Sequence, residues 1–299
     1  MQELGSVNRN EVASYLGYLL RRARIAAAQL GTDSDPPESL DAEGGRLRCL
    51  AILLVIIQHG PVSQQWLAKY LKINRSVMVK LIDVLERRGD VVRARNAADR
   101  RSYALGVTAS GRAHAKTLSA SVRRLSRELA TALSAAELRR LVGLLSELVG
   151  PRFSPELPRA LLDSPIWLIT TAHEHMEAFG DERLEPLGLS VRTYVSLAVL
   201  SGMARSQTEL AKHMLIGPAA TVDLVDELER RGAARRVRNL TDRRSYSLEV
   251  TTEGQRLQVL GREVIAGSTA EFTKNLDRES NEELVALLGR LTAVAERAD

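Results

Sequence analysis

Two short runs of charged residues have the composition of a nucleic-acid contact. Positions 99–103 and 242–246 both read Asp-Arg-Arg-Ser-Tyr and lie 143 residues apart. An arginine can bond to phosphates or enter a minor groove, and a neighbouring carboxylate can hold a second arginine in position. A single surface arginine is usually a solvated charge. Because these arginines recur in the same setting in two places, we interpret them as contacts to a nucleic acid. The candidates in and beside the two runs are Arg93, Arg95, Asp99, Arg100, Arg101, Arg235, Arg236, Arg238, Asp242, Arg243 and Arg244.

The same offset of 143 residues extends well beyond these runs. Between Ser63 and Arg112, about half of the positions carry the same residue 143 positions later, without a gap. A period this long is too large for a solenoid repeat and fits a duplicated domain. The stretch 151–158 contains three prolines and is interpreted as a linker. We therefore expect two copies of one domain, at 1–150 and 159–299.

The pattern of the first copy predicts a helix-turn-helix followed by a β-hairpin. Ser63 can cap a short helix, a break follows at 72–74, and a second helix ends before Gly89. The next segment has strand-like runs on both sides of a polar turn, and a hairpin in this place is a wing. We expect helices over 10–29, 46–58, 64–71, 75–88 and 109–132, a last one from the capping box at 134–137 to Gly150, and strands over 91–95 and 102–107.

The second copy predicts the same order of elements. Pro218 stands at the first position of a helix, where its fixed φ is favourable. The chain is thus expected to be mainly α with small β-wings, as two winged helix-turn-helix domains. The expected helices are 165–184, 190–201, 207–214, 218–231, 252–275 and 279–296, with a hairpin over 233–250.

These features resemble the MarR family of bacterial transcription regulators. The resemblance rests on Ser-Gln-x-x-Leu-Ala-Lys at 63–69 and 206–212, on Leu-Glu-Arg-Arg-Gly at 85–89 and 228–232, and on the Asp-Arg-Arg wings, each followed by Leu-x-Val-Thr-x-x-Gly. It covers nearly the whole chain. It implies a helical dimerisation layer, which two fused copies would form within one chain as a pseudo-dimer. It also implies a roughly palindromic double-stranded operator, and release by a small phenolic or other apolar effector or by oxidation.

The candidate base contacts lie where the second helix of each helix-turn-helix begins. This end of a recognition helix enters the major groove, where Arg can fork onto guanine and Asn or Ser can bond base edges or phosphates. In the wings, the resemblance favours Arg101 and Arg244 as the residues inserted into the minor groove. The recognition-helix candidates are Lys72, Asn74, Arg75, Ser76 and Lys80 in the first copy and Thr221 in the second.

The two copies differ at the positions expected to contact DNA. All three recognition-helix cations of the first copy are lost in the second, because Lys72, Arg75 and Lys80 become Leu215, Pro218 and Asp223. The second wing is denser in charge, with arginines at both 235 and 236. We hypothesise that the first copy recognises bases in the major groove, that the second holds DNA mainly through its wing, and that the operator is an imperfect palindrome.

The composition excludes several classes of protein. The chain has 299 residues, a net charge of +5 and 4% aromatic residues, which supply few rings for stacking single-stranded bases. No stretch reaches the roughly 18 apolar residues of a membrane helix, and the N-terminus lacks a signal pattern. The single cysteine fits a reducing compartment, so we expect a cytoplasmic protein without membrane contact.

Other reactive residues do not form a recognisable site in the sequence. Cys49 is interpreted as a partly buried structural thiol rather than an oxidation sensor. His173 and His175 point to different faces of a helix, and with Glu174 and Glu177 they are interpreted as a solvated helix face. There is no phosphate-cradling glycine loop, nucleophile elbow or paired-cysteine zinc spacing, so we expect no metal, no cofactor and no enzyme activity.

Two functions remain open at this point. The first is a ligand-responsive transcription regulator, more often a repressor among proteins of this kind. The alternative is a ligand-sequestering or protein-interaction module whose second copy has lost DNA binding. Binding to duplex DNA that weakens steeply as salt rises would favour the first.

Overall fold

The computed structural model describes residues 9–30, 45–95, 103–150, 156–202, 206–238 and 246–295. Its contacts form two compact bodies, and their limits do not coincide with the halves of the sequence. The larger body comprises 15–175 and 273–299, and the smaller comprises 1–14 and 176–272. The last helix of the second copy therefore belongs to the body that contains the first winged unit.

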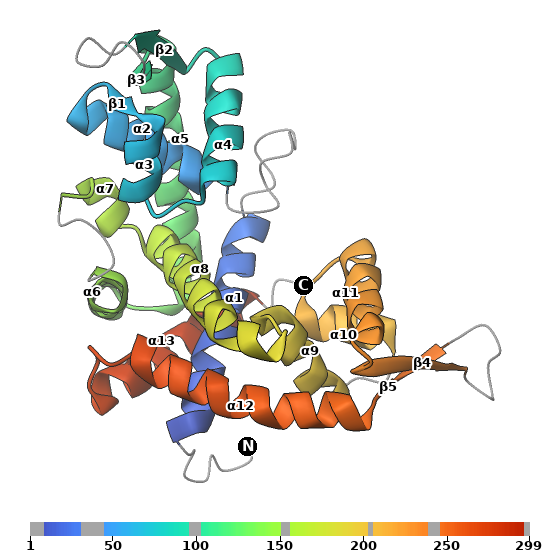
Figure 1. Ribbon diagram of the computed structural model, residues 1–299. Helices are drawn as coiled ribbons and strands as arrows, with labels where there is room; N and C mark the ends of the chain where they lie inside the picture. The colour runs from blue at the N-terminus through green and yellow to red at the C-terminus, as the bar shows by residue number, and fades with distance from the viewer. Residues whose placement is uncertain are drawn as a thin grey trace. The chain divides into compact units, whose positions relative to one another are not determined.

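The larger body holds the first helix-turn-helix and its wing (Figure 1). Its sheet has the order β1-β3-β2, and both pairings are antiparallel, with Arg93 opposite Leu105. The helices bury an apolar core that includes Leu53, Leu67 and Ile82. The elements are α1 (Arg9–Leu30), α2 (Gly45–His59), β1 (Val62–Ser63), α3 (Gln64–Tyr70), α4 (Arg75–Arg87), β2 (Val91–Arg95), β3 (Tyr103–Val107), α5 (Ala109–Leu129), η2 (Ala130–Ala132), α6 (Ala135–Val149), α7 (Arg159–Leu162), the first half of α8 (Pro165–Leu184) and α13 (Arg278–Ala295).

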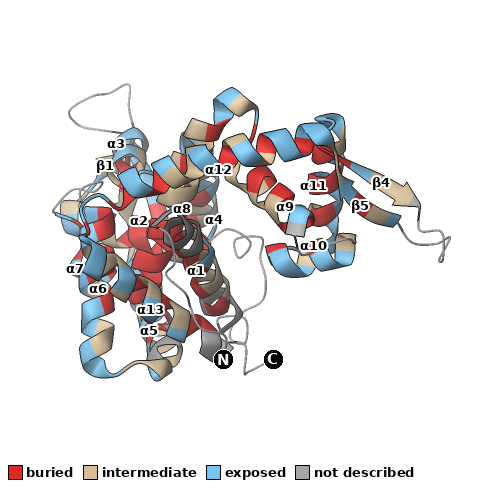
Figure 2. Ribbon diagram, turned by 90° about the horizontal axis from the view of Figure 1, so that it is seen from below, coloured by how far each residue is buried: buried red, intermediate tan, exposed pale blue. Residues whose placement is uncertain are grey.

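The smaller body repeats the winged arrangement around its own core. Leu197, Leu210, Leu224 and Leu228 are members of one buried cluster, and Figure 2 shows the buried residues concentrated on facing sides of the helices. The β4–β5 hairpin projects beyond α10 and α11 in Figure 1. The elements after α8 are η4 (Glu185–Leu187), α9 (Val191–Gly202), α10 (Gln207–Met214), α11 (Pro218–Arg230), β4 (Ala234–Arg238), β5 (Tyr246–Val250) and α12 (Thr252–Phe272).

The fold class expected from the sequence is confirmed. Most element bounds differ from expectation by no more than two residues, and local signals explain why. Ser134 and Glu137 form the predicted capping box of α6, with each side chain bonding the other residue's backbone N–H. Two ends differ by three residues: α5 gives way to the 3-10 turn η2 at 130–132 instead of continuing to 132, and α12 ends at Phe272 instead of 275. The short helix α7 was not predicted. Within the described part of the chain, no helix has the length and apolar character needed to cross a membrane.

Helices α6 and α13 pack together within the larger body, and their contacts relate matching positions of the two copies. Arg140 Nε donates to Glu283 Oε2 at 2.7 Å, and residue 283 is the counterpart of residue 140 at the offset of 143. Arg290 bonds both oxygens of Glu137 and the carbonyl of Ala132. A residue that contacts its own counterpart lies near a twofold axis, as in an isologous dimer interface.

Candidate nucleic-acid interface

The turn of each helix-turn-helix is made in the same way. Lys72 and Leu215, which are counterparts, have φ of 55° and 50° and are the non-glycine residues with positive φ among those described. A left-handed residue in this place costs an L-amino acid of the order of 1 kcal/mol, which the packed helices on either side must outweigh. The turn then leads into α4 after the cap Asn74 and into α11 after the cap Gly217.

The first-copy candidates form an exposed surface at the start of α4. Lys72, Arg75 and Lys80 are all exposed. Asn74 and Ser76 are exposed too, but they bond to each other: Asn74 Oδ1 accepts from both the backbone N–H and the hydroxyl of Ser76, at 2.9 Å each. Asn74 is therefore the helix cap, and the three cations are the exposed basic side chains at this end of α4.

The structure corrects the prediction for Thr221. Its side chain is buried, with 2% of the residue exposed, and its hydroxyl donates to the carbonyl of Gly217 at 2.9 Å. The first-copy counterpart is Met78, which is wholly buried. Thr221 thus occupies a core position of α11, where it cannot present its hydroxyl to a base.

The tips of both wings lie outside the described residues. These tips carry the predicted candidates Asp99, Arg100, Arg101, Asp242, Arg243 and Arg244, and the side chains of Arg95 and Arg238 lie outside the description as well. The strands that lead to the tips are described and are paired in register. The prediction that these arginines contact DNA therefore remains a prediction.

Arg93 joins the first wing to its recognition helix. Its Nη2 lies 3.0 Å from Asp83 Oδ1 and its Nε 2.9 Å from Glu86 Oε2, and both carboxylates are on α4. This guanidinium, predicted to lie near phosphates, is thus held between two carboxylates of its own domain. The contact ties β2 to α4.

Arg236 makes the same junction in the second copy. Its Nη1 lies 2.7 Å from Asp226 Oδ1, and it also pairs with Glu229, whose Oε1 accepts from the backbone N–H of Arg236. Burial works against the cation, but the bonds to Asp226 and Glu229 outweigh burial and raise the pKa of Arg236. These four carboxylates are not among the residues predicted from the sequence. Their signal was present, because Asp and Glu recur three residues apart in both recognition helices.

Arg235 also faces a carboxylate. Its counterpart is Val92, and in the second wing Arg235 pairs across the strands with Glu249 at 2.8 Å. Both side chains are largely exposed, so the pair contributes little and the guanidinium can exchange partners. The two arginines that made the second wing denser in charge are therefore each matched by acidic residues.

The two recognition helices differ in the sign of their charge. Of the 13 residues of α4, three are basic and two acidic, whereas of the 13 residues of α11 one is basic and four are acidic. Net charges of +1 and −3 follow. The two helices therefore differ in their electrostatic suitability for a negatively charged partner.

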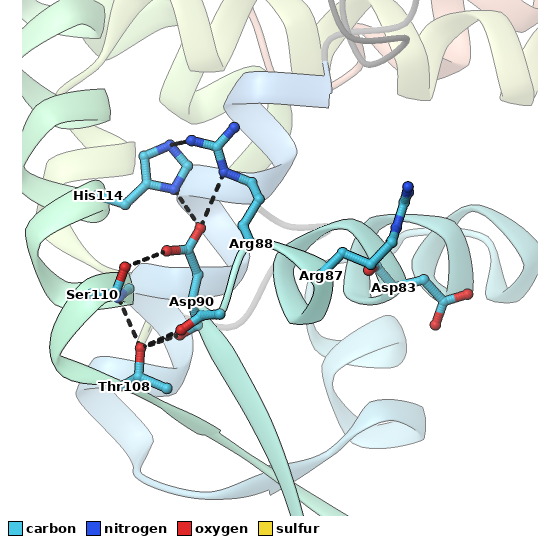
Figure 3. A network of polar contacts seen from close by, with 9 residues as sticks. Asp83, Arg87, Arg88, Asp90, Thr108, Ser110 and His114 are labelled. Carbon is cyan, nitrogen blue, oxygen red and sulfur yellow. Dashed lines mark hydrogen bonds and ion pairs between the residues drawn. The ribbon is translucent and has the colours of Figure 1, made fainter.

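A polar network that the sequence does not predict lies at the end of α4 (Figure 3). The carboxylate of Asp90 is buried and contacts Arg88, Ser110 and His114, with His114 Nδ1 at 2.7 Å from Asp90 Oδ2. These residues lie up to 26 positions apart, so sequence spacing did not associate them.

Two residues considered as sensors or ligands are buried in the larger body. Burial raises the pKa of the Cys49 thiol to about 12, with Arg88 lowering it and Asp90 raising it, which supports the interpretation of a structural thiol. For His173 the expected solvated face is wrong. The residue is 6% exposed, and burial, with the nearby Arg24 and Arg21, lowers its pKa to about 3. Glu174 pairs with Arg48 at 2.9 Å.

Comparisons with known proteins agree with this arrangement of two winged units. Models described as "MarR family" match residues 46–102 and, separately, residues 203–246. A putative transcriptional regulatory protein for the hcr operon of Thauera aromatica is 32% identical over 146 residues, which cover 49% of this chain and 86% of that protein.

Solved structures with similarity to the chain include two from bacteria. The reduced form of MarR from E. coli is 24% identical, with 39% of this chain and 87% of that one covered and a TM-score of 0.37. CouR from Rhodococcus jostii RHA1, bound to p-coumaroyl-CoA, is 26% identical, with 45% and 96% covered and a TM-score of 0.40.

Proposed function

The chain belongs to the MarR family, and on this premise we propose that it is a DNA-binding transcription regulator in which one polypeptide does the work of a dimer. The observation that carries this proposal is the presence of two winged helix-turn-helix units in one chain, each with the same order of elements. The first unit also has an exposed cationic surface at the start of α4. Exposed cations at this end of a recognition helix suit contact with base edges and phosphates in the major groove.

The proposal of a pseudo-dimer is supported by the α6–α13 contact. In an isologous interface, residues near the axis meet their own counterparts, as Arg140 and Glu283 do. The last helix of the second copy therefore occupies, within the larger body, the place that a partner subunit's helix would take. Two chains need not associate for each winged unit to have a dimerisation layer.

We further propose that the operator is an imperfect palindrome that is recognised unequally. The first winged segment, 62–107, has ten basic and four acidic residues, whereas its counterpart, 205–250, has nine basic and seven acidic. The acidic α11 disfavours a close approach to phosphates, so the second copy would depend on the cations of its wing, chiefly Arg238, Arg243 and Arg244. Arg236 contributes less than the sequence suggested, because Asp226 and Glu229 already hold it.

We also propose that the protein is a repressor and that a small apolar or phenolic effector releases it from DNA. This part of the proposal rests on the family, in which such effectors commonly release the regulator from its operator. The cytoplasm is the compartment in which such a regulator would act. The alternative, a ligand-sequestering or protein-interaction module, is favoured by one observation, the net charge of −3 on α11.

Selection of bound genomic fragments by the full chain, followed by titration of the selected duplex at several salt concentrations, tests the proposal. A regulator should enrich a defined site and lose affinity steeply as salt rises, with a logarithmic slope of several units. Enrichment of no sequence, together with binding that salt does not affect, would support the alternative instead.

A further inference from the structure

The junction between recognition helix, wing and the following helix has the same backbone in both copies. Thr108 N donates to Asp90 O at 3.0 Å, and Thr251 N donates to Ala233 O at 3.1 Å. The two threonine hydroxyls donate to Gly89 O and Gly232 O at 2.7 and 2.6 Å. The first turns of α5 and α12 are thus fastened to the same point of each wing by matching bonds.

The first turn of each following helix lies so close to the backbone at the start of the wing that only glycine fits at the point of contact. A Cβ at position 111 would lie 2.1 Å from Asp90 O, and one at position 254 would lie 1.9 Å from Ala233 O. This explains the glycine of the Leu-x-Val-Thr-x-x-Gly motif in both copies. The backbone of the junction is therefore the same in the two copies, and only the side chains of the junction differ.

In the first copy the side chains form a polar network around one buried carboxylate. The side chain of Asp90 is 3% exposed. Its carboxylate accepts from Ser110 Oγ at 3.2 Å and lies 2.7 Å from His114 Nδ1 and 3.4 Å from Arg88 Nε. Arg88 Nη2 also lies 3.5 Å from His114 Nε2. As Figure 3 shows, the network joins the end of α4, the start of β2 and the first turns of α5.

In the second copy the same positions are apolar. The counterparts of Asp90 and His114 are Ala233 and Leu257, which are 0% and 6% exposed and belong to the core cluster of the smaller body. An apolar contact has no preferred direction, whereas a buried carboxylate with several partners tolerates only the geometry that satisfies it. The junction is consequently specified more tightly in the first copy than in the second.

We propose that Asp90 and His114 are positioning residues for DNA binding by the first copy, fixing the angle between its recognition helix and its wing. This inference rests on the proposed function. The five residues of β2 span roughly 17 Å at about 3.3 Å per residue. A rotation of about 6° at Asp90 would therefore displace the far end of β2 by about 2 Å, and a displacement of this size is enough to break a direct hydrogen bond made from the wing.

The test exchanges the polar pair for the apolar pair that the second copy already uses. The variant D90A/H114L should unfold at nearly the same temperature as the wild type, because Ala and Leu pack at this junction in the smaller body. Its affinity for the selected operator should nevertheless fall roughly 3- to 30-fold, the range seen when positioning networks are altered. The variant H114Q retains a donor for Asp90 and an acceptor for Arg88, and it should bind within about twofold of wild type.

Each outcome decides between the proposals. If the wild type shows no salt-dependent binding, the proposed function fails and the positioning role fails with it. If the wild type binds and D90A/H114L binds equally well, the positioning role is overturned while the proposed function stands. The conservative change L257M, at the matching place in the second copy, should leave affinity unchanged and serves as the control.

A second variant keeps the proposal open to refutation if D90A/H114L does not fold. The isosteric D90N keeps the shape of residue 90 and removes the charge that attracts Arg88 and His114. It should weaken binding about threefold or more, and a folded D90N protein with wild-type affinity would overturn the proposal.

Discussion

The two recognition helices, α4 and α11, show how a duplicated scaffold can diverge in surface chemistry. Both have 13 residues, follow a left-handed turn residue and end before a glycine. Their cores use matching positions, such as Leu85 and Leu228, both fully buried. Their outer charges nevertheless have opposite signs. In a homodimer both recognition helices must change together, whereas fusion lets one change alone.

The largest effect should come from the feature that the copies share. Gly111→Ala and Gly254→Ala each place a Cβ about 2 Å from a backbone oxygen, so each should lower the free energy of unfolding by about 2–3 kcal/mol. Urea denaturation measures this. Gly143→Ala, in the middle of α6 with nothing within 4 Å, should instead stabilise by about 0.5–1 kcal/mol. If only one of the two substitutions were destabilising, the two junctions would not be equivalent.

The next largest effect should come from exchanging the charges that distinguish the helices. Lys80→Asp should weaken operator binding about tenfold and reduce the salt slope by about 1, because a phosphate contact is lost. Asp223→Lys, the opposite change at the matching position, should strengthen binding several-fold. Titration at two salt concentrations checks both. If D223K changed neither the affinity nor the salt slope, α11 would lie away from DNA, and the second copy would contact DNA through its wing alone.

A smaller difference should distinguish the two wing junctions. Arg236 is less exposed than Arg93, at 25% against 36% of the side chain, and Glu229 also accepts from its backbone. Glu229→Gln should therefore cost about 1–2 kcal/mol of stability, and Glu86→Gln about 0.5 kcal/mol. Thermal unfolding of the two variants measures the order, and the reverse order would show that burial does not govern these contacts.

The smallest effect concerns the contact between the copies. The bonds from Arg290 and from Ser134 lower the pKa of Glu137 from 4.5 to about 2. Since the folded pKa is depressed, this contact contributes fully above pH 4.5 and is lost as pH falls toward 2. Both groups are exposed, so the effect on stability is small. In Arg290→Ala, NMR titration should show the pKa of Glu137 rising, while Glu253, whose pKa Arg256 lowers, stays unchanged. An unmoved Glu137 would argue against the α6–α13 contact.

The sequence predicted the elements well because local signals determine them. Caps, glycine stops and apolar periodicity are short-range, and the duplication gave each element two independent instances. Positions that depend on packing were harder. Thr221 looked like a polar surface residue, although its counterpart Met78 is apolar, and that comparison alone indicates a core position. His173 looked solvated because its helix was judged without the helices that cover it. The Asp90 network joins three elements, and no spacing rule connects them.

The contribution of the second copy is measured most directly by a base-resolution footprint on the selected operator. Methylation interference at guanine N7 reports major-groove contacts, and hydroxyl-radical cleavage reports contacts to the sugar-phosphate backbone. We predict guanine interference in one half-site and backbone protection in both. Equal guanine interference in both half-sites would contradict the central claim that the fused copies recognise DNA unequally.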